Sequence, residues 1–264
     1  IIDRANLITV NNTKDLYLRK MRMNETSKAN SATMFGNPRF YSGNTGDRRI
    51  ADLPGTEKEV DQLNSLLSTK GWNTAEYTES LASEEQVKKL NNPKIFHIAT
   101  HGFYSPAIEK NLDQEMTITE NQLSENPLMK SGLLLKGAGD ILSKTDYNYN
   151  MENGVLTAYE AMNLNLDNTD LVVLSACETG LGEVIYGEGV YGLQRAFLVA
   201  GAKMLIMSMF KVDDEATQKL ILTFYNKWLT TGKIRESFTA AKKELRAEYE
   251  DPIFWGAFMM VGLE

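Results

Sequence analysis

Cysteine and histidine are nearly absent from this chain of 264 residues, which has one cysteine and two histidines. A single cysteine cannot form an internal disulfide, and a zinc site built on thiolates usually needs two to four cysteines or several histidines. We therefore expect no disulfide, no metal and no cofactor. A chain of this kind suits a reducing compartment, so the cytoplasm is the expected location.

Basic residues are also in short supply. The chain has 28 Lys and Arg against 35 Asp and Glu, so its formal net charge is −7. Neutralising a phosphate backbone requires a surplus of positive charge. The composition thus argues against direct binding to nucleic acid or to an anionic membrane surface.

Long apolar runs are missing as well. The longest, residues 204–210, is far shorter than the roughly 20 residues that cross a bilayer, and the N-terminus has no signal-peptide pattern. We expect no membrane association. Because the chain begins with Ile1 and not with Met, we also expect it to be a piece of a longer protein.

Three short apolar runs, at residues 95–100, 171–176 and 204–210, are typical of buried parallel strands. Weaker strand patterns occur elsewhere, and amphipathic stretches that lie between strands predict helices. This alternation predicts an α/β fold with a mostly parallel central sheet and helices on both faces. The other predicted strands are 32–35, 132–136 and 254–261, and the predicted helices are 56–71, 83–90, 156–164, 190–199, 213–229 and 234–249.

Side chains near two helix starts are candidate caps. Thr56 with Glu59, and Ser83 with Gln86, have the spacing of a capping box, in which the first side chain accepts from a backbone N–H three residues on. Asp213 and Asp214 are candidate caps of the long helix that follows them.

The chain divides near residue 50. Residues 1–50 are irregular in pattern, and we interpret them as an N-terminal segment separate from the main domain. Residues 51–264 form the predicted main domain. Within it, the polar stretch 105–130 is too long for an ordinary connection, so we expect either a functional loop or a partly disordered segment. Its ordering could open or block a nearby cleft.

His101 and Cys177 each follow a predicted buried strand. Sites in open α/β sheets gather at the carboxyl ends of strands, so neighbouring strands would bring these side chains together. A thiol has a pKa of about 8.5, and a nearby imidazole can take its proton at neutral pH. The pair predicts a cysteine nucleophile with a histidine base. Gly102 has no side chain, so its N–H could stabilise an oxyanion beside the N–H of Cys177.

Other interpretations of these residues exist. A lone cysteine in an apolar strand is by default an inert buried thiol. His97 shares a strand face with His101 and competes with it as the base, although its place inside the apolar run favours a buried, hydrogen-bonded role. The segment 187–192 matches the dinucleotide-binding fingerprint, with Asp213 further on, but about ten residues separate it from the preceding strand.

Two sequence blocks carry a family resemblance. They are His-Ile-Ala-Thr-His-Gly at 97–102 and Leu-Ser-Ala-Cys-Glu-Thr-Gly at 174–180. They resemble the signature blocks of CHAT-domain proteins, which are relatives of caspases and separases. The likeness covers roughly residues 50–262, so 51–264 is identified as a CHAT caspase-like peptidase domain. By the same resemblance, residues 1–50 are a linker or the end of a preceding pseudo-peptidase region. Further matching blocks are Gly-Glu-Gly at 187–189, Arg-Ala-Phe at 195–197, Ala-Gly-Ala at 200–202, Val-Asp-Asp at 212–214 and Phe-Trp-Gly-Ala-Phe at 254–258.

The resemblance implies a cysteine endopeptidase with His101 and Cys177 as a catalytic dyad. It also implies that Gly102 and Cys177 supply the oxyanion amides, and that a peptide bond is cleaved through a thioacyl enzyme. Candidate substrate-binding residues are Glu178, Lys211, Asp213 and Asp214. In separases an acid in the corresponding turn helps form the pocket for a basic substrate side chain. This chain has Lys211 there, so the preferred substrate residue is left open.

The resemblance further implies a place in bacterial signalling or defence, behind an N-terminal repeat or sensor region or an activating partner. The implied substrate is a protein, either gasdermin-like or another defence effector. The alternative is a catalytically idle, peptidase-like module for protein interactions.

Overall fold

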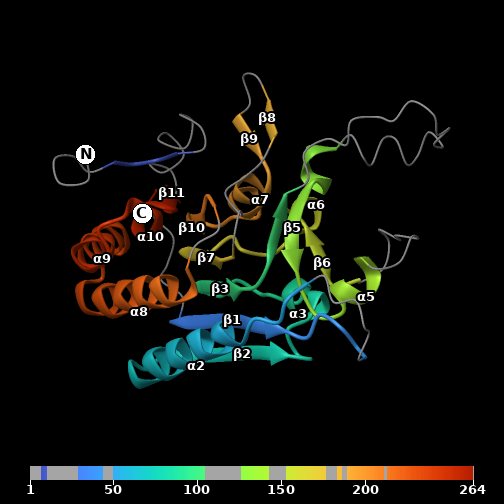
Figure 1. Cartoon of the computed structure of the whole chain (residues 1–264), viewed down its shortest axis with the longest axis horizontal. Helices are drawn as coiled ribbons and strands as arrows, with labels where there is room; N and C mark the ends of the chain where they lie inside the picture. Colours follow the sequence, from blue (N-terminus) through green and yellow to red (C-terminus); the bar gives the residue numbers. More distant parts are fainter. Residues whose placement is uncertain are drawn as a thin grey trace.

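Six strands form the central sheet of the protein in a computed structural model (Figure 1), in the order β11-β10-β7-β3-β1-β2. All pairings are parallel except that of β11 with β10. The strands are β1 (Ser31–Pro38), β2 (Asn73–Glu79), β3 (Ile95–Ala99), β7 (Leu171–Ser175), β10 (Met204–Ser208) and β11 (Phe258–Gly262). The structure describes residues 7–10, 29–43, 50–104, 126–142, 153–176, 183–185, 189–210 and 213–263.

Both faces of this sheet are buried, which explains why three of its inner strands, β3, β7 and β10, have largely apolar sequences. In β3, Phe96 and Ile98 point to one face, whereas Ile95 and Ala99 point to the other. Helices α3 (Glu84–Lys88), α6 (Ala158–Ala161) and α7 (Leu193–Val199) contribute apolar residues to the first face, and α2 (Pro54–Thr69), α8 (Asp214–Thr231) and α9 (Ile234–Glu248) contribute to the second. The predicted fold class, a mostly parallel sheet with helices on both faces, is confirmed.

A second, antiparallel sheet begins directly after His101. It consists of β4 (Gly102–Tyr104), β5 (Ser131–Leu134) and β6 (Val155–Thr157). A separate hairpin is formed by β8 (Glu183–Ile185) and β9 (Gly189–Tyr191). The hairpin lies where the dinucleotide fingerprint would need a tight turn into a helix, and α7 begins only after it.

Several predicted elements differ from those observed. The strand expected at 132–136 is present as β5, which ends at Leu134 and belongs to the second sheet. The helix expected at 156–164 is β6 followed by α6, with Thr157 and Glu160 forming a capping box. The strand expected at 254–261 is α10 (Pro252–Gly256) followed by β11, because Asp251 caps a short helix that Pro252 opens.

The start of α2 also corrects a prediction. Thr56 and Glu59 do not form a capping box, since the N-cap is Leu53 and no side chain caps the helix. The hydroxyl of Thr56 donates to the Leu53 carbonyl and accepts from the N–H of Asn37. Glu59 is instead turned inward, with 3% of its surface exposed. Its carboxylate therefore lies among the residues that pack between helix and sheet.

Residues within the predicted N-terminal segment contribute to the sheet. Strand β1 lies between β2 and β3, and Thr9 forms a parallel bridge with Val261 of β11. The division of the chain near residue 50 stays a prediction. The remaining short elements are η1 (Pro127–Met129) and α5 (Ala138–Leu142). Within the described ranges, no helix combines the length and apolar character that crossing a bilayer demands.

Candidate active site

The carboxyl ends of β3 and β7 lie side by side, and these are the strands that precede His101 and Cys177. Their parallel pairing sets Ala99 opposite Ser175, so paired residues differ by 175 − 99 = 76 in number. His101 and Cys177 differ by the same amount, 177 − 101 = 76. Cys177 itself lies outside the described residues. The described part of the site is therefore the histidine and the two strand ends that lead to the pair.

The ring of His101 is held by a backbone carbonyl. Its Nε2 atom lies 2.8 Å from the oxygen of Ala51, and the ring packs against Phe40 with centroids 5.3 Å apart. A carbonyl oxygen can only accept a hydrogen bond, so Nε2 carries the proton and the neutral ring has its lone pair on Nδ1. Among the described residues Nδ1 has no hydrogen-bond partner. The imidazole is thus set to accept a proton at Nδ1.

The carbonyl of Ala51 reaches His101 because of where α2 begins. Residues 51–53 lead into the helix, which Pro54 opens and whose side chains Val60 and Leu63 pack against the sheet. Sequence reasoning missed this contact, because a main-chain oxygen can come from any residue and leaves no signature.

Gly102 begins β4, where one hydrogen bond defines the direction of its N–H. The N–H of Leu134 donates to the carbonyl of His101 at 2.8 Å, and Gly102 is opposite Leu133. Antiparallel pairs alternate between those that exchange hydrogen bonds and those that do not. The pair Gly102 and Leu133 is of the second kind, so the Gly102 N–H points away from β5, toward the open edge of β4.

His97 has a different environment from His101. It is fully buried, its Nε2 lies 2.9 Å from Oε1 of Glu59, and its Nδ1 lies 3.4 Å from the hydroxyl of Tyr225. Ser175 donates to Oε2 of the same glutamate at 3.1 Å. The interpretation of His97 as a buried, hydrogen-bonded histidine is confirmed.

Burial, and then the negative charge of Glu59, raise the pKa of Tyr225 well above its usual value. The phenol therefore keeps its proton and donates to Nδ1 of His97. The proton of the neutral His97 ring is then on Nε2, where it is donated to the carboxylate. The four side chains form a continuous hydrogen-bond chain from Tyr225 through His97 and Glu59 to Ser175.

The candidate substrate-binding residues are only partly described. Asp213 is the N-cap of α8, since its Oδ1 accepts from the N–H of Ala216 at 2.9 Å, and Asp214 lies in the first turn. Both are exposed and follow the carboxyl end of β10. Glu178 and Lys211 lie outside the described residues, as does the loop at 105–125.

Two exposed apolar side chains mark the same edge of the sheet. Met209 and Phe210 follow β10 directly and are 36% and 41% exposed. The amide of Met209 is fixed by the carbonyl of Ala257 at 3.0 Å. They form an apolar surface directly after the carboxyl end of β10.

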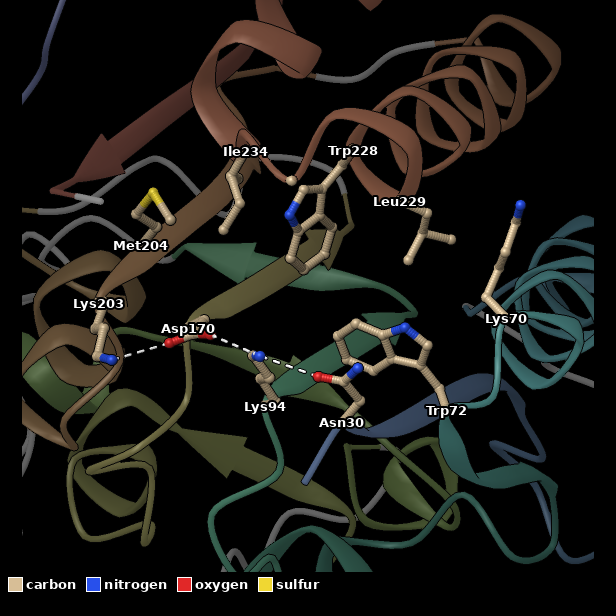
Figure 2. Close-up of a pocket in the computed structure, with 11 residues that line it drawn as sticks. Asn30, Lys70, Trp72, Lys94, Asp170, Lys203, Met204, Trp228, Leu229 and Ile234 are labelled. Carbon is tan, nitrogen blue, oxygen red and sulfur yellow. Dashed lines mark hydrogen bonds and ion pairs between the residues drawn. The ribbon is translucent and has the colours of Figure 1, made fainter. Parts of the chain in front are cut away.

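A cavity of about 500 Å³ lies at the opposite, amino edge of the sheet (Figure 2). Trp72 and Trp228 lie among its lining residues, and its charged lining groups are three lysines (Lys70, Lys94 and Lys203) and one carboxylate, Asp170. Asp170 pairs with Lys203 at 2.9 Å and with Lys94 at 3.8 Å. Because these residues precede their strands, the cavity is separate from the edge at which His101 lies.

Comparison with solved structures defines the class of fold. The chain resembles the Arg-specific cysteine proteinase gingipain R, with a TM-score of 0.51 and 8% identity, over 89% of this chain and 46% of that one. A second structure, of the pro- and mature domains of RgpB from Porphyromonas gingivalis, gives 0.51 and 9%, over 89% and 47% of the two chains. At such low identity the likeness shows the fold, which is that of caspase-like cysteine peptidases.

The family model for the CHAT domain matches residues 2–263, so the chain belongs to the CHAT family. Two curated relatives are tetratricopeptide repeat protein 28 of Mus musculus and of Homo sapiens, each 25% identical over 253 residues. The match covers 93% of this chain and 10% of each relative. The chain thus spans about a tenth of the length of these proteins.

Proposed function

We propose that this protein is a cysteine endopeptidase in which His101 and Cys177 form the catalytic dyad. The observation that carries the proposal is the hydrogen bond from His101 Nε2 to Ala51, which leaves Nδ1 as the base. The shared offset of 76 residues between β3 and β7 supports it, because a register continued by two residues pairs His101 with Cys177. The CHAT family and the caspase-like fold agree with this chemistry.

In the proposed reaction, Nδ1 of His101 takes the thiol proton of Cys177 and the thiolate attacks the peptide carbonyl carbon. The N–H groups of Gly102 and Cys177 stabilise the oxyanion. The imidazolium gives its proton to the leaving amine, and a thioacyl enzyme remains. Water, deprotonated by His101, then attacks the thioacyl carbon, and the released thiolate is ready for another cycle.

The proposal also covers the class of substrate. We propose a protein substrate, gasdermin-like or another defence effector, whose side chains contact Glu178, Lys211, Asp213 and Asp214. The exposed apolar surface of Met209 and Phe210 lies at the carboxyl end of β10 and suits an apolar substrate side chain. A cytoplasmic role in bacterial signalling or defence, without direct binding to nucleic acid or membrane, remains part of the proposal.

Regulation by an N-terminal repeat region is proposed from the relatives. These relatives are named for tetratricopeptide repeats, and this chain matches only a tenth of their length. We propose that such a region, or a separate activating partner, controls access to the cleft.

The test is cleavage of a peptide library by the purified protein. The proposed N-terminal region or activating partner is present in the assay. Cleavage should be abolished by Cys177→Ala and by His101→Ala, while a control substitution at exposed Lys58 should leave it unchanged. If Cys177→Ala cleaves as fast as the unmodified chain, the proposal is wrong.

The second candidate is a peptidase-like interaction module with an idle dyad, because the name of the curated relatives mentions repeats and no peptidase activity. Alkylation of Cys177 separates the two, since an activated thiolate reacts with iodoacetamide at about pH 6.5 whereas an ordinary thiol is largely protonated there. An idle dyad predicts the slow reaction of a free thiol.

A further inference from the structure

The carboxylate of Glu59 lies between the two strands that precede the proposed dyad. Its Oε1 is 2.9 Å from His97 Nε2 on β3, and its Oε2 is 3.1 Å from Ser175 Oγ on β7. His101 follows four residues after His97, and Cys177 follows two residues after Ser175. One side chain, from a third element, thus bonds to both strands just before their ends.

This contact differs from an ordinary structural ion pair in its burial. Glu59 is 3% exposed, His97 is fully buried, and Ser175 is 7% exposed. Burying a carboxylate is expensive unless its hydrogen bonds are satisfied, and here both oxygens have partners. A polar network at this depth also fixes its members closely, because each lost hydrogen bond would leave a buried group unpaired.

Helix α2 and the residues before it contact both His101 and the two strands that lead to the proposed dyad. The carbonyl of Ala51, just before the helix, binds the ring of His101, and Glu59, inside the helix, binds His97 and Ser175. Tyr225 of α8 completes the network at His97 Nδ1. The base and the two strands are therefore positioned by one helix.

We propose that Glu59 is a positioning residue that fixes the spacing of the ends of β3 and β7, so that His101 and Cys177 meet at hydrogen-bond distance. This inference rests on the proposed function. Glu59 does not contact the reacting atoms, and it acts through the strands that carry them. A displacement of about 1 Å at a reacting pair can lower a rate about a hundredfold, so even a small change in strand spacing should be measurable.

The readout is alkylation of Cys177 by iodoacetamide, measured by mass spectrometry across the pH range. The chain has one cysteine, so every label reports on this thiol. Glu59→Ala should lower the alkylation rate at about pH 6.5 by about tenfold or more and move the pH profile toward that of a free thiol. Ser175→Ala, which removes only the contact with β7, should lower it by about threefold.

Glu59→Gln tests whether geometry or charge matters. Glutamine has the same length and can still accept from His97 while its amide contacts Ser175. A positioning role predicts that it retains the rate within about threefold, whereas Glu59→Asp, which is too short to reach both partners, behaves like alanine.

Glu84→Ala is the matched control. Glu84 is also buried, at 1% exposure, and it also accepts hydrogen bonds through one carboxylate, from the N–H groups of Asn153 and Gly154. It should lower thermal stability without changing the alkylation profile. Each variant is checked by circular dichroism, and if Glu59→Ala does not fold, Ser175→Ala and Glu59→Asp decide the matter.

The outcomes separate the two proposals. If the unmodified chain alkylates no faster than a free thiol at about pH 6.5, the proposed function fails and the inference fails with it. If the unmodified chain is fast and the folded Glu59→Ala, Glu59→Asp and Ser175→Ala variants are equally fast, only the inference is wrong. It is also wrong if Glu84→Ala slows alkylation as much as Glu59→Ala does.

Discussion

Nε2 of His101 lies 2.8 Å from the carbonyl oxygen of Ala51, so a main-chain atom selects which nitrogen of the ring carries the proton. The ring is further held by its contact with Phe40. Its Nδ1 atom has no hydrogen-bond partner within the described ranges, so the ring can accept a proton from one direction. This relationship gives the proposed dyad its orientation and leads to two predictions about the histidines.

The first prediction concerns the tautomers. With only two histidines in the chain, nitrogen-15 NMR of the imidazole rings should give two resolvable patterns. At a pH where the rings are neutral, both should be protonated on Nε2, His101 because of Ala51 and His97 because of Glu59. A His101→Ala variant assigns the signals. A proton on Nδ1 of the neutral His101 ring would contradict the orientation described here.

The second prediction concerns the reactivity of the thiol. Replacing His101 by Gln removes the base, so the rate of Cys177 alkylation at about pH 6.5 should fall by about tenfold or more, toward that of a free thiol. Phe40→Leu loosens the support of the ring while leaving the base in place, and it should give a smaller decrease. Equal rates for His101→Gln and the unmodified chain would exclude His101 as the activating group.

The third prediction uses Lys242 of α9. Its Nζ donates to the carbonyl of Phe258 at 2.7 Å and lies 5.7 Å from the ring centre of Phe238. Burial lowers the pKa of Lys242 from 10.5 to about 8. Between these values the unfolded chain binds more protons than the folded one, so this group's contribution to stability rises with pH across that window.

The free-energy cost of burying the charged ammonium of Lys242 is therefore fully present below about pH 8. Lys242→Met should raise the free energy of unfolding at neutral pH by about 1 kcal/mol, with an upper limit of ~3 kcal/mol from the pKa shift. The gain should shrink as the pH rises toward the ordinary lysine value. Lys58→Met, at an exposed lysine of α2, is the control, and urea unfolding at several pH values measures both. A gain that stays constant with pH would exclude this account.

The fourth prediction compares two glycines with positive φ. Gly201, after α7, has a φ of 112°, and an added Cβ would lie 2.5 Å from the Cα of Asp167. Gly232, after α8, has a φ of 72° and open space around it. Gly232→Ala should cost about 1 kcal/mol for backbone strain alone, and Gly201→Ala about 2 kcal/mol or more because of the added clash. Urea unfolding of both variants tests the order, and equal losses would contradict it.

Three inner strands of the sheet could be predicted because burial on both faces leaves a strong signal, whereas β2, whose residues are half-buried or exposed, was not expected. Strands β3, β7 and β10 are continuous apolar runs, and each was expected within a residue or two of its observed bounds. Short helices and strands were harder to predict, because a few residues show little hydrophobic periodicity. The strand β6 and the helix α6, which meet at Thr157, were expected as one helix.

The network at Glu59 was missed for a different reason. Its spacing from Thr56 matched a capping box, and this local pattern concealed the fact that Glu59 precedes Leu63 and Leu67 on the buried side of the helix. Their regular spacing was the signal that could have placed the glutamate inward. The contact of His101 with Ala51 had no such signal, because it depends on the path of the main chain.

Strand β11 lies at the end of the central sheet, where its outer hydrogen-bonding groups would be unpaired. The N–H of Gly262 donates to the carbonyl of Thr9 at 3.0 Å, so residues from the beginning of the chain cover part of this strand. Unpaired sheet edges are common starting points for aggregation. Truncations that remove Thr9 would therefore leave backbone groups of β11 unpaired and promote aggregation. Expression fragments should retain Thr9.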